Sequence, residues 1–183
     1  MALTSSMLPL GTVAPPFVLP DVTTGLPVSL SDFTEKDALL VMFICKHCPY
    51  VVHIRPELTR LGRDYASSSL AIVAISSNDP ISYPEDSPSE LKAMVAEAGF
   101  PFPLLFDVTQ DVARAYDAVC TPDFFLFDRD RRLVYRGQLD DSRPSRGTAD
   151  GSDLRPAIDA VLTGKPVNPN QKPSSGCGIK WKK

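Results

Sequence analysis

The sequence feature that most constrains the fold is the apolar run ALLVMFI at residues 38–44, which leads directly into the cysteine pair CKHC at 45–48. A continuous apolar run of this length is typical of a β-strand that is buried on both faces. The pattern from 49 to about 67 is helical, with a kink or break expected at Pro56. We therefore expect both cysteines at a junction between a buried strand and a helix.

The rest of the chain alternates between strand-like and helix-like segments. Strands are predicted at 69–76, 102–107, 124–128 and 132–137, with the last two forming a hairpin, and helices at 88–98, 109–118 and 152–163. The second helix has Ser87 as its N-cap and is ended by Gly99. This order predicts an α/β fold in which a mixed central β-sheet has helices on both faces.

The two ends of the chain differ from this body. Residues 1–27 are proline-rich, with a short extended piece at 17–19, and we assign 1–164 to one domain. The tail, 165–183, is rich in Pro, Ser and Gly and carries five lysines but no acidic residue, although the whole chain has a net charge of −3. We expect no regular structure in the tail, which either folds back on the acidic body or docks a partner.

Composition excludes several classes of protein. The mild acidity gives no reason to expect nucleic-acid binding, and no apolar run approaches the ~20 residues of a membrane helix. The start, MALTSSMLPLG, lacks the basic and apolar regions of a secretory signal, so we expect a cytoplasmic protein without membrane contact. Cytosolic thiols are kept reduced, which argues against a structural disulfide framework for the four cysteines.

The cysteine pair has the features of a reactive dithiol. The N-terminus of a helix stabilises an anion, so a thiol there has a lowered pKa, and Lys46 and His47 add positive charge and a hydrogen-bond donor. Cys45 is expected to be the exposed attacking thiol. Cys48, one helical turn further on, is then placed to attack a mixed disulfide and release the partner.

Two other interpretations of the pair are weaker. A zinc site needs about four converging ligands, and the additional candidates, His47, His53, Cys120 and Cys177, are scattered along the chain. We therefore predict no metal. Two inert core thiols are also disfavoured, because Lys-His-Cys-Pro is too polar for a core segment. A redox-active CxxC dithiol is the favoured interpretation.

Three motifs together resemble the thioredoxin-like superfamily, and within it the redoxin or alkyl hydroperoxide reductase–thiol-specific antioxidant branch with its peroxiredoxin-like and thiol-disulfide isomerase-like members. They are CKHC after an apolar strand, TPDFFLFD followed by a hairpin and a closing helix, and the N-terminal LPLGTVAPPFVLPD…VSLSDF, all within residues 8–163. The resemblance implies a thioredoxin-like fold with a redoxin-type N-terminal extension. It also implies that Thr121-Pro122 is the cis-proline turn that faces the dithiol and orients the substrate, and that no bound cofactor is needed.

The chain departs from the family patterns in several places. Lys46-His47 stands where thioredoxins have Gly-Pro, and the strand at 38–44 lacks their buried acid. The peroxiredoxin pattern Pro-x-x-x-Thr/Ser-x-x-Cys fits neither cysteine, although Cys48 is followed by Pro49. Peroxide reduction also needs an arginine, for which Arg55 and Arg136 are candidates by residue type alone. Our first hypothesis is thus a thiol–disulfide oxidoreductase. The alternatives are a peroxiredoxin-like hydroperoxide reductase and a non-enzymatic redox-sensing or scaffold domain.

The remaining residues leave several questions open. Cys120 is either a buried small side chain or an auxiliary thiol, and Cys177 is either a mobile resolving thiol or incidental. Trp181 and Ile179 could hold the tail to the body, His53 is expected on a helix surface, and the acidic stretch 84–90 is expected to be a solvated loop. The expected partners are a disulfide-containing protein or a small thiol or peroxide substrate, and a thiol electron donor.

Overall fold

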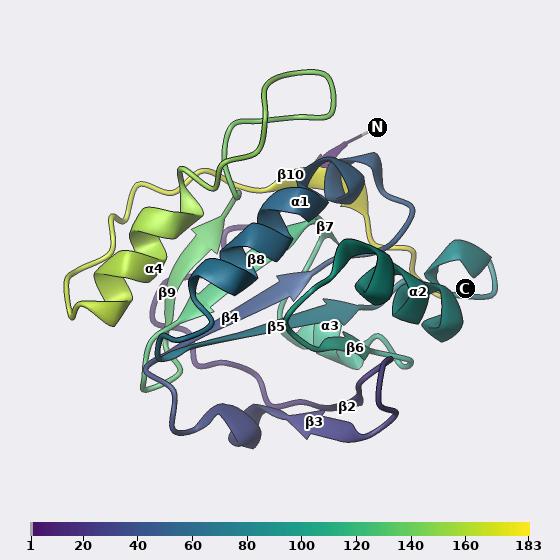
Figure 1. Cartoon of the computed structure of the whole chain (residues 1–183), viewed down its shortest axis with the longest axis horizontal. Coiled ribbons are helices and arrows are strands. Elements are labelled where there is room, and N and C mark those ends of the chain that lie inside the picture. The colour runs from purple at the N-terminus through teal and green to yellow at the C-terminus, as the bar shows by residue number, and fades with distance from the viewer. Residues whose placement is uncertain (1) are drawn as a thin grey trace.

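A computed structural model of the chain, which describes residues 2–183, has a five-stranded mixed sheet at its centre (Figure 1). The strand order is β6-β5-β4-β8-β9, with β4 parallel to β5, β5 parallel to β6, and β8 antiparallel to both β4 and β9. The strands are β4 (Ala38–Phe43), β5 (Leu70–Ser76), β6 (Leu104–Phe106), β8 (Asp123–Phe127) and β9 (Leu133–Gly137). The predicted mixed sheet and closing hairpin are confirmed.

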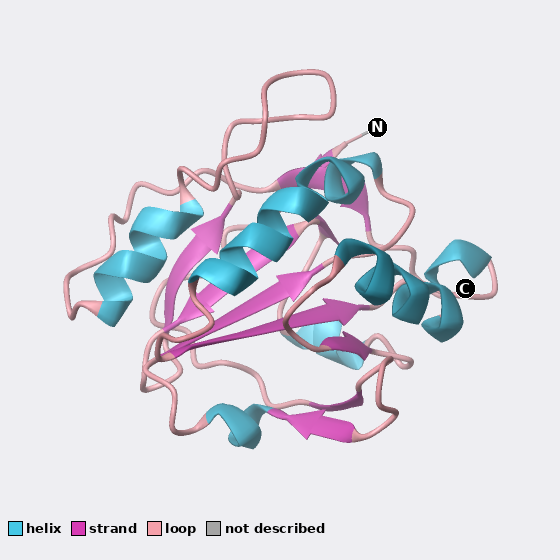
Figure 2. Cartoon of the chain, in the orientation of Figure 1, coloured by secondary structure: helices cyan, strands magenta, loops and turns pink. Residues whose placement is uncertain are grey.

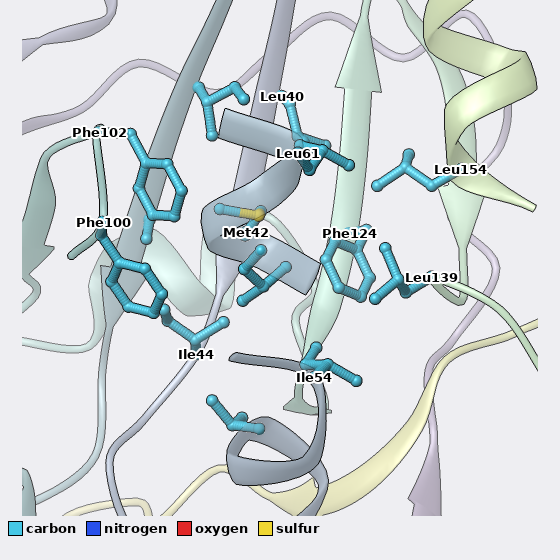
Figure 3. Close-up of a cluster of buried hydrophobic side chains, with 14 of the residues drawn as sticks. Leu40, Met42, Ile44, Ile54, Leu61, Phe100, Phe102, Phe124, Leu139 and Leu154 are labelled. Atoms are coloured by element: carbon cyan, nitrogen blue, oxygen red, sulfur yellow. The ribbon is translucent and has the colours of Figure 1, made fainter. Parts of the chain in front are cut away.

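Alternate residues of β4 face two separate hydrophobic cores. Leu40 and Met42 pack under three helices, α1 (Pro49–Asp64), α2 (Pro88–Ala98) and α4 (Leu154–Leu162), as the close-up in Figure 3 shows for the core beneath α1. Leu39 and Val41 face the opposite side, where α3 (Asp111–Ala115) and the N-terminal segment cover the sheet. Because β4 is buried on both faces, its sequence is apolar at every position.

The helices follow the sequence signals with two differences. Helix α2 begins after the N-cap Ser87 and ends at Gly99, whose φ of 65° is the left-handed conformation that glycine adopts most easily. Helix α1 runs through Pro56 without the expected break. Helix α3 is shorter than predicted and ends before Tyr116. The Tyr116 ring is buried in the second core.

The N-terminal extension forms its own small hairpin. Strands β2 (Val18–Pro20) and β3 (Pro27–Ser29) pair antiparallel and lead into a 3-10 helix at Leu30–Phe33. Phe17 and Leu19 from this region are buried in the second core. The extension is therefore part of the packed fold and covers the sheet face opposite α1.

The C-terminal tail is more ordered than the sequence suggests. Residues Ser175–Gly178 form strand β10, which lies antiparallel between β1 (Leu3–Thr4) and β7 (Cys120–Thr121) in a separate three-stranded sheet (Figure 2). The expectation of a tail without regular structure is wrong in this segment. The short strands β1 and β7, which come from distant parts of the chain, supply the hydrogen-bonding partners of β10, and neither has a sequence signal of its own.

Candidate active site

The cysteine pair lies at the predicted junction. Cys45 comes two residues after β4, and Cys48 is the N-cap of α1, with Pro49 as the first helical residue. Both side chains are buried, with exposed fractions of 1% for Cys45 and 0% for Cys48. The expectation that Cys45 is exposed is therefore wrong. Both side chains belong to the core beneath α1, against which Cys177 also packs.

The turn that faces the dithiol is the predicted one. The Thr121–Pro122 peptide bond is cis, which confirms the expectation taken from the family resemblance. The Cys45 Sγ lies 3.2 Å from the Thr121 Oγ1, and the Cys48 thiol is 3.2 Å from the Thr121 carbonyl oxygen, in hydrogen-bonding geometry. A single residue of the turn thus contacts both sulfurs.

The negative charge of the pair is favoured on Cys48. The pKa of Cys48 is lowered to about 4, first by the hydrogen bond with the Cys45 thiol and further by Cys177 and the N–H of Val51 in the first turn of α1. The pKa of Cys45 is raised by the same hydrogen bond to Cys48, by burial and by the charge of Asp86. The hydrogen bond between the two thiols thus favours a single negative charge on the pair, with Cys48 as the group of lower pKa.

Asp86 is the site residue that the sequence did not reveal. It lies in a 3-10 turn at Pro84–Asp86, and its side chain is fully buried. Its carboxylate accepts hydrogen bonds from the backbone N–H of Lys46 at 2.7 Å and from the Asn78 amide at 2.7 Å, and it lies 2.5 Å from the His47 Nδ1. The acidic stretch expected to be a solvated loop therefore braces the CKHC segment from the side.

The two residues between the cysteines each pair with a carboxylate outside the motif. The His47 ring pairs with Asp86 and stacks on Tyr83, with ring centroids 5.4 Å apart. The Lys46 Nζ forms an ion pair with Glu90 at 2.6 Å. The motif thus directs its histidine and lysine toward carboxylates on the neighbouring turn and helix.

Three possible metal donors come together here, although the sequence gave no reason to expect it. One donor atom each of Cys45, His47 and Asp86 lies within 4.8 Å of the others. Both Asp86 oxygens already accept hydrogen bonds, one from the Lys46 backbone N–H and the other from the Asn78 side-chain amide. The donor set is thus better explained as a hydrogen-bonded brace than as a metal centre.

The other two cysteines lie around the same turn. The Cys120 thiol is buried 3.7 Å from the Pro122 carbonyl oxygen, and burial raises its pKa. Cys177, on β10, is half-buried and pairs in register with Thr121, so the backbone edge beside the dithiol is occupied by the chain's own tail. Burial, followed by contact with Cys48, raises the pKa of Cys177 to about 11.

The arginines and the remaining residues have mostly structural partners. Arg136 is fully buried, lies 3.4 Å from the Asp123 carboxylate and covers the Phe125 ring, so it holds the core beneath β8. The Arg55 guanidinium donates to the Lys46 carbonyl, and burial lowers its pKa. His53 is half-buried, with its Nε2 2.9 Å from the Ser142 Oγ.

Comparison with known proteins agrees with this arrangement. The fold and the dithiol facing a cis-proline turn define a thioredoxin-like redox protein. A model of the AhpC/TSA family matches residues 10–136, and the chain belongs to this family. Family membership together with the site supports a thiol redox function of the oxidoreductase type. Among residues 2–183, none of the helices is both long enough and apolar enough to cross a membrane.

Solved structures extend the similarity over the whole chain. An uncharacterized conserved protein from Geobacillus kaustophilus is 55% identical with a TM-score of 0.97, and the match covers 100% of this chain and 97% of that one. A hypothetical protein from Sinorhizobium meliloti 1021 is 52% identical with a TM-score of 0.96 over 98% of each chain. The thioredoxin domain of a thiol-disulfide oxidoreductase from Bacteroides vulgatus shares the fold, at 23% identity and a TM-score of 0.67 over 85% of this chain and 99% of that one. No curated protein matches the sequence.

Proposed function

We propose that the protein is a thiol–disulfide oxidoreductase in which Cys45 and Cys48 form the redox pair. The observation that carries this proposal is that the two sulfurs lie at the N-terminus of α1 and that both contact Thr121 of the cis-proline turn. A dithiol with one stabilised thiolate is suited to disulfide exchange, since the thiolate is the reactive form. No bound cofactor is required, because the electrons come from the dithiol itself.

The proposed mechanism begins with a proton transfer inside the pair. As Cys45 attacks a substrate disulfide, its proton moves to Cys48 along their hydrogen bond, a mixed disulfide forms and one substrate thiolate leaves. The Cys45 thiol that lowered the pKa of Cys48 is then gone, so Cys48 holds the proton. That thiolate takes the proton from Cys48. Cys48 then attacks Cys45 in the mixed disulfide, which forms the Cys45–Cys48 bond and releases the second substrate thiolate. The substrate gains two electrons and the dithiol loses two.

The remaining residues have supporting roles in this proposal. Thr121 and Pro122 orient the substrate beside Cys45, while His47, held by Asp86, fixes the geometry of the segment between the cysteines. A thiol donor regenerates the dithiol. The substrate class is a disulfide-containing protein or a small disulfide. Strand β4 is apolar and offers no acidic side chain as a proton acceptor, so Cys48 serves as the internal base.

The test is catalysis of insulin reduction by dithiothreitol. Wild-type protein should accelerate the reaction above the background rate, Cys45→Ser and Cys48→Ser should not, and Cys120→Ser, which removes a buried thiol outside the pair, should retain the activity. Equal rates for wild type and Cys45→Ser would refute the proposal. Full loss in Cys120→Ser would place the redox pair elsewhere.

One observation favours peroxide reduction as a second candidate function. Arg55 lies within electrostatic range of Cys45, and its guanidinium is partly buried beside the CKHC segment, where it could polarise a hydroperoxide. Stopped-flow mixing of the reduced protein with hydrogen peroxide separates the two functions. Rapid sulfenate formation at Cys48 that survives Cys45→Ser would favour the peroxidase, whereas slow oxidation beside rapid insulin reduction would favour disulfide exchange.

A further inference from the structure

The chain's own tail occupies the backbone edge next to the dithiol. Strand β10 pairs antiparallel with β7, so that Cys177 lies opposite Thr121 and Gly178 lies opposite Cys120. The pairing continues one residue further, where the Ile179 N–H donates to the Val119 carbonyl at 3.1 Å. This is the edge that an extended partner chain would need in order to lie along the turn beside Cys45.

The position of strand β10 is sterically constrained by its neighbours. A Cβ at position 176 would overlap the carbonyl oxygen of Thr121, and one at Gly178 would meet the Leu3 side chain at 2.8 Å. Only glycine at 176 lets the tail approach the turn without displacing backbone. Gly176, which suggests flexibility in the sequence, is therefore required for this close contact.

Both ends of the strand are also anchored. On one side, Ser5 and Ser174 exchange hydrogen bonds, with the Ser174 N–H 2.9 Å from the Ser5 Oγ. On the other side, the Lys180 N–H donates to the Asn78 Oδ1 at 2.9 Å, and the Gln110 amide donates to the Lys180 carbonyl at 2.8 Å. The strand is thus held at a defined register, which fixes the position of Cys177.

The register places Cys177 against the redox pair. Cys177 lies opposite Thr121, whose carbonyl oxygen is 3.2 Å from the Cys48 Sγ, and it packs against the core that contains Cys45 and Cys48. Cys177 is half-buried, whereas Cys45 and Cys48 are almost fully enclosed. Of these three thiols, Cys177 is therefore the one nearest to solvent.

We propose that Ser175–Gly178 is an internal substrate strand and that Cys177 is a third redox thiol, which exchanges with the Cys45–Cys48 disulfide. This inference rests on the proposed function, because that reaction generates the disulfide. In the exchange, the Cys177 thiolate attacks the Cys48 sulfur, the Cys45–Cys48 bond breaks, a Cys48–Cys177 bond forms, and Cys45 leaves as a thiolate. The number of electrons on the protein is unchanged.

The exchange moves the disulfide from the enclosed pair toward the surface. An external thiolate can then attack Cys177, which forms a mixed disulfide there and releases the Cys48 thiolate. A second external thiol resolves this mixed disulfide, so that two thiols are oxidised and the protein recovers its three free thiols. Cys177 is thus the entry point for the thiol electron donor.

The first experiment asks which thiol bonds to Cys48 when Cys45 is absent. Reduced Cys45→Ser protein is oxidised with diamide, and the linked peptides are identified by mass spectrometry after digestion under non-reducing conditions. We expect a Cys48–Cys177 peptide from the monomer and little Cys48–Cys120 peptide. Because Cys120 is a competing buried thiol at the same turn, a dominant Cys48–Cys120 bond, or none within the chain, would overturn the proposal.

The second experiment moves the strand while leaving every thiol in place. Gly176→Ala introduces the overlapping Cβ, so the yield of the Cys48–Cys177 bond in the oxidised protein should fall by about tenfold or more, since displacement of a reacting group by about 1 Å can cost that much. The matched control is Ser175→Ala in the same strand, which adds no atom and should leave the yield unchanged. An unchanged yield in Gly176→Ala would overturn the role of the strand.

The insulin assay distinguishes the two proposals. Insulin turnover by the wild type without any Cys48–Cys177 bond in Cys45→Ser would overturn the third-thiol inference and leave the proposed function intact. A Cys48–Cys177 bond without insulin turnover would overturn the proposed function alone. With both in place, Cys177→Ser should slow re-reduction of the oxidised protein by glutathione relative to Cys120→Ser, and equal re-reduction rates for the two variants would contradict the entry point.

Discussion

The two sides of the dithiol offer opposite environments to two chemically identical side chains. On the Cys45 side lies the fully buried carboxylate of Asp86, whose charge raises the pKa of Cys45. On the Cys48 side lie the first turn of α1 and the tail strand with Cys177, which lower the pKa of Cys48. The hydrogen bond between the two thiols has the largest effect on both pKa values, and residues outside the CKHC motif add to the difference between the two sulfurs.

Replacing Cys48, the cysteine with the lowered pKa, should have the largest effect on the titration of the pair. The reduced wild type should show a thiolate ultraviolet absorbance that titrates near pH 4, because the pKa of Cys48 is lowered to about 4. In Cys48→Ser this step should vanish, and Cys45, beside Asp86 and buried, should ionise only at alkaline pH. Cys120→Ser should retain the step. Loss of the step in Cys45→Ser but not in Cys48→Ser would reverse the assignment.

The same pKa shift predicts a pH dependence of stability in the reduced protein. The thiol of Cys48 has a pKa of 9.0 when unfolded and about 4 when folded, so the unfolded state binds more protons between these values. The free energy of unfolding should rise with pH across this window, and the gain should be lost as pH falls through about 4. Urea denaturation of wild type and Cys48→Ser at several pH values measures it. Parallel curves for the two proteins would contradict the prediction.

Removing the charge of Asp86, on the Cys45 side of the pair, should have an intermediate effect on the titration. Asp86→Asn keeps the size of the side chain but removes the charge beside Cys45, so in a Cys48→Ser background Cys45 should ionise at a lower pH than with Asp86 present. The buried N–H groups that Asp86 accepts would lose their charged partner, which should reduce the free energy of unfolding by about 1–3 kcal/mol.

The control for this change is Glu85→Gln, the exposed acidic neighbour of Asp86. It removes the same charge from the same turn without touching the CKHC segment and should leave both the Cys45 titration and the unfolding free energy unchanged. If Glu85→Gln shifts the titration as much as Asp86→Asn does, the effect comes from the general acidity of the turn rather than from a specific contact.

The difference between the two sides also marks how far the sequence could predict the site. The junction of strand and helix, the cysteine pair and the Thr121-Pro122 turn were all predicted, because apolar runs, caps and the family motifs are local signals. Asp86 was not, since its role depends on a contact with Lys46, 40 positions away, and a short acidic stretch next to prolines is typical of a solvated loop. Burial of a single carboxylate has no local signature.

The tail was misjudged for a related reason. Strands β1, β7 and β10 are only two to four residues long and have no alternating pattern, so each gains its structure from the other two. Gly176 and Gly178 normally indicate a flexible segment. Here they allow a close approach to Thr121 and Leu3, which becomes visible only when all three strands are placed together.

The smallest effect is expected at Lys46, which lies within the motif and was predicted from the sequence to tune the thiolate. Its Nζ pairs with the half-exposed Glu90 at 2.6 Å, and ion pairs of this kind contribute about 0–1 kcal/mol. Lys46→Gln should therefore change the free energy of unfolding by less than about 1 kcal/mol and leave the titration near pH 4 in place. The backbone N–H that holds Asp86 is unaffected by the substitution.

The companion variant Glu90→Gln makes this comparison sharper, because it frees the Lys46 ammonium without removing it. If Lys46 acts only through Glu90, the two variants should give the same small loss of stability and the same titration of Cys48. If the freed ammonium turns toward the sulfurs, the titration should move to lower pH in Glu90→Gln alone. A shift to higher pH in Lys46→Gln would show instead that the lysine already stabilises the thiolate, and the charge distribution would then be set partly from within the motif.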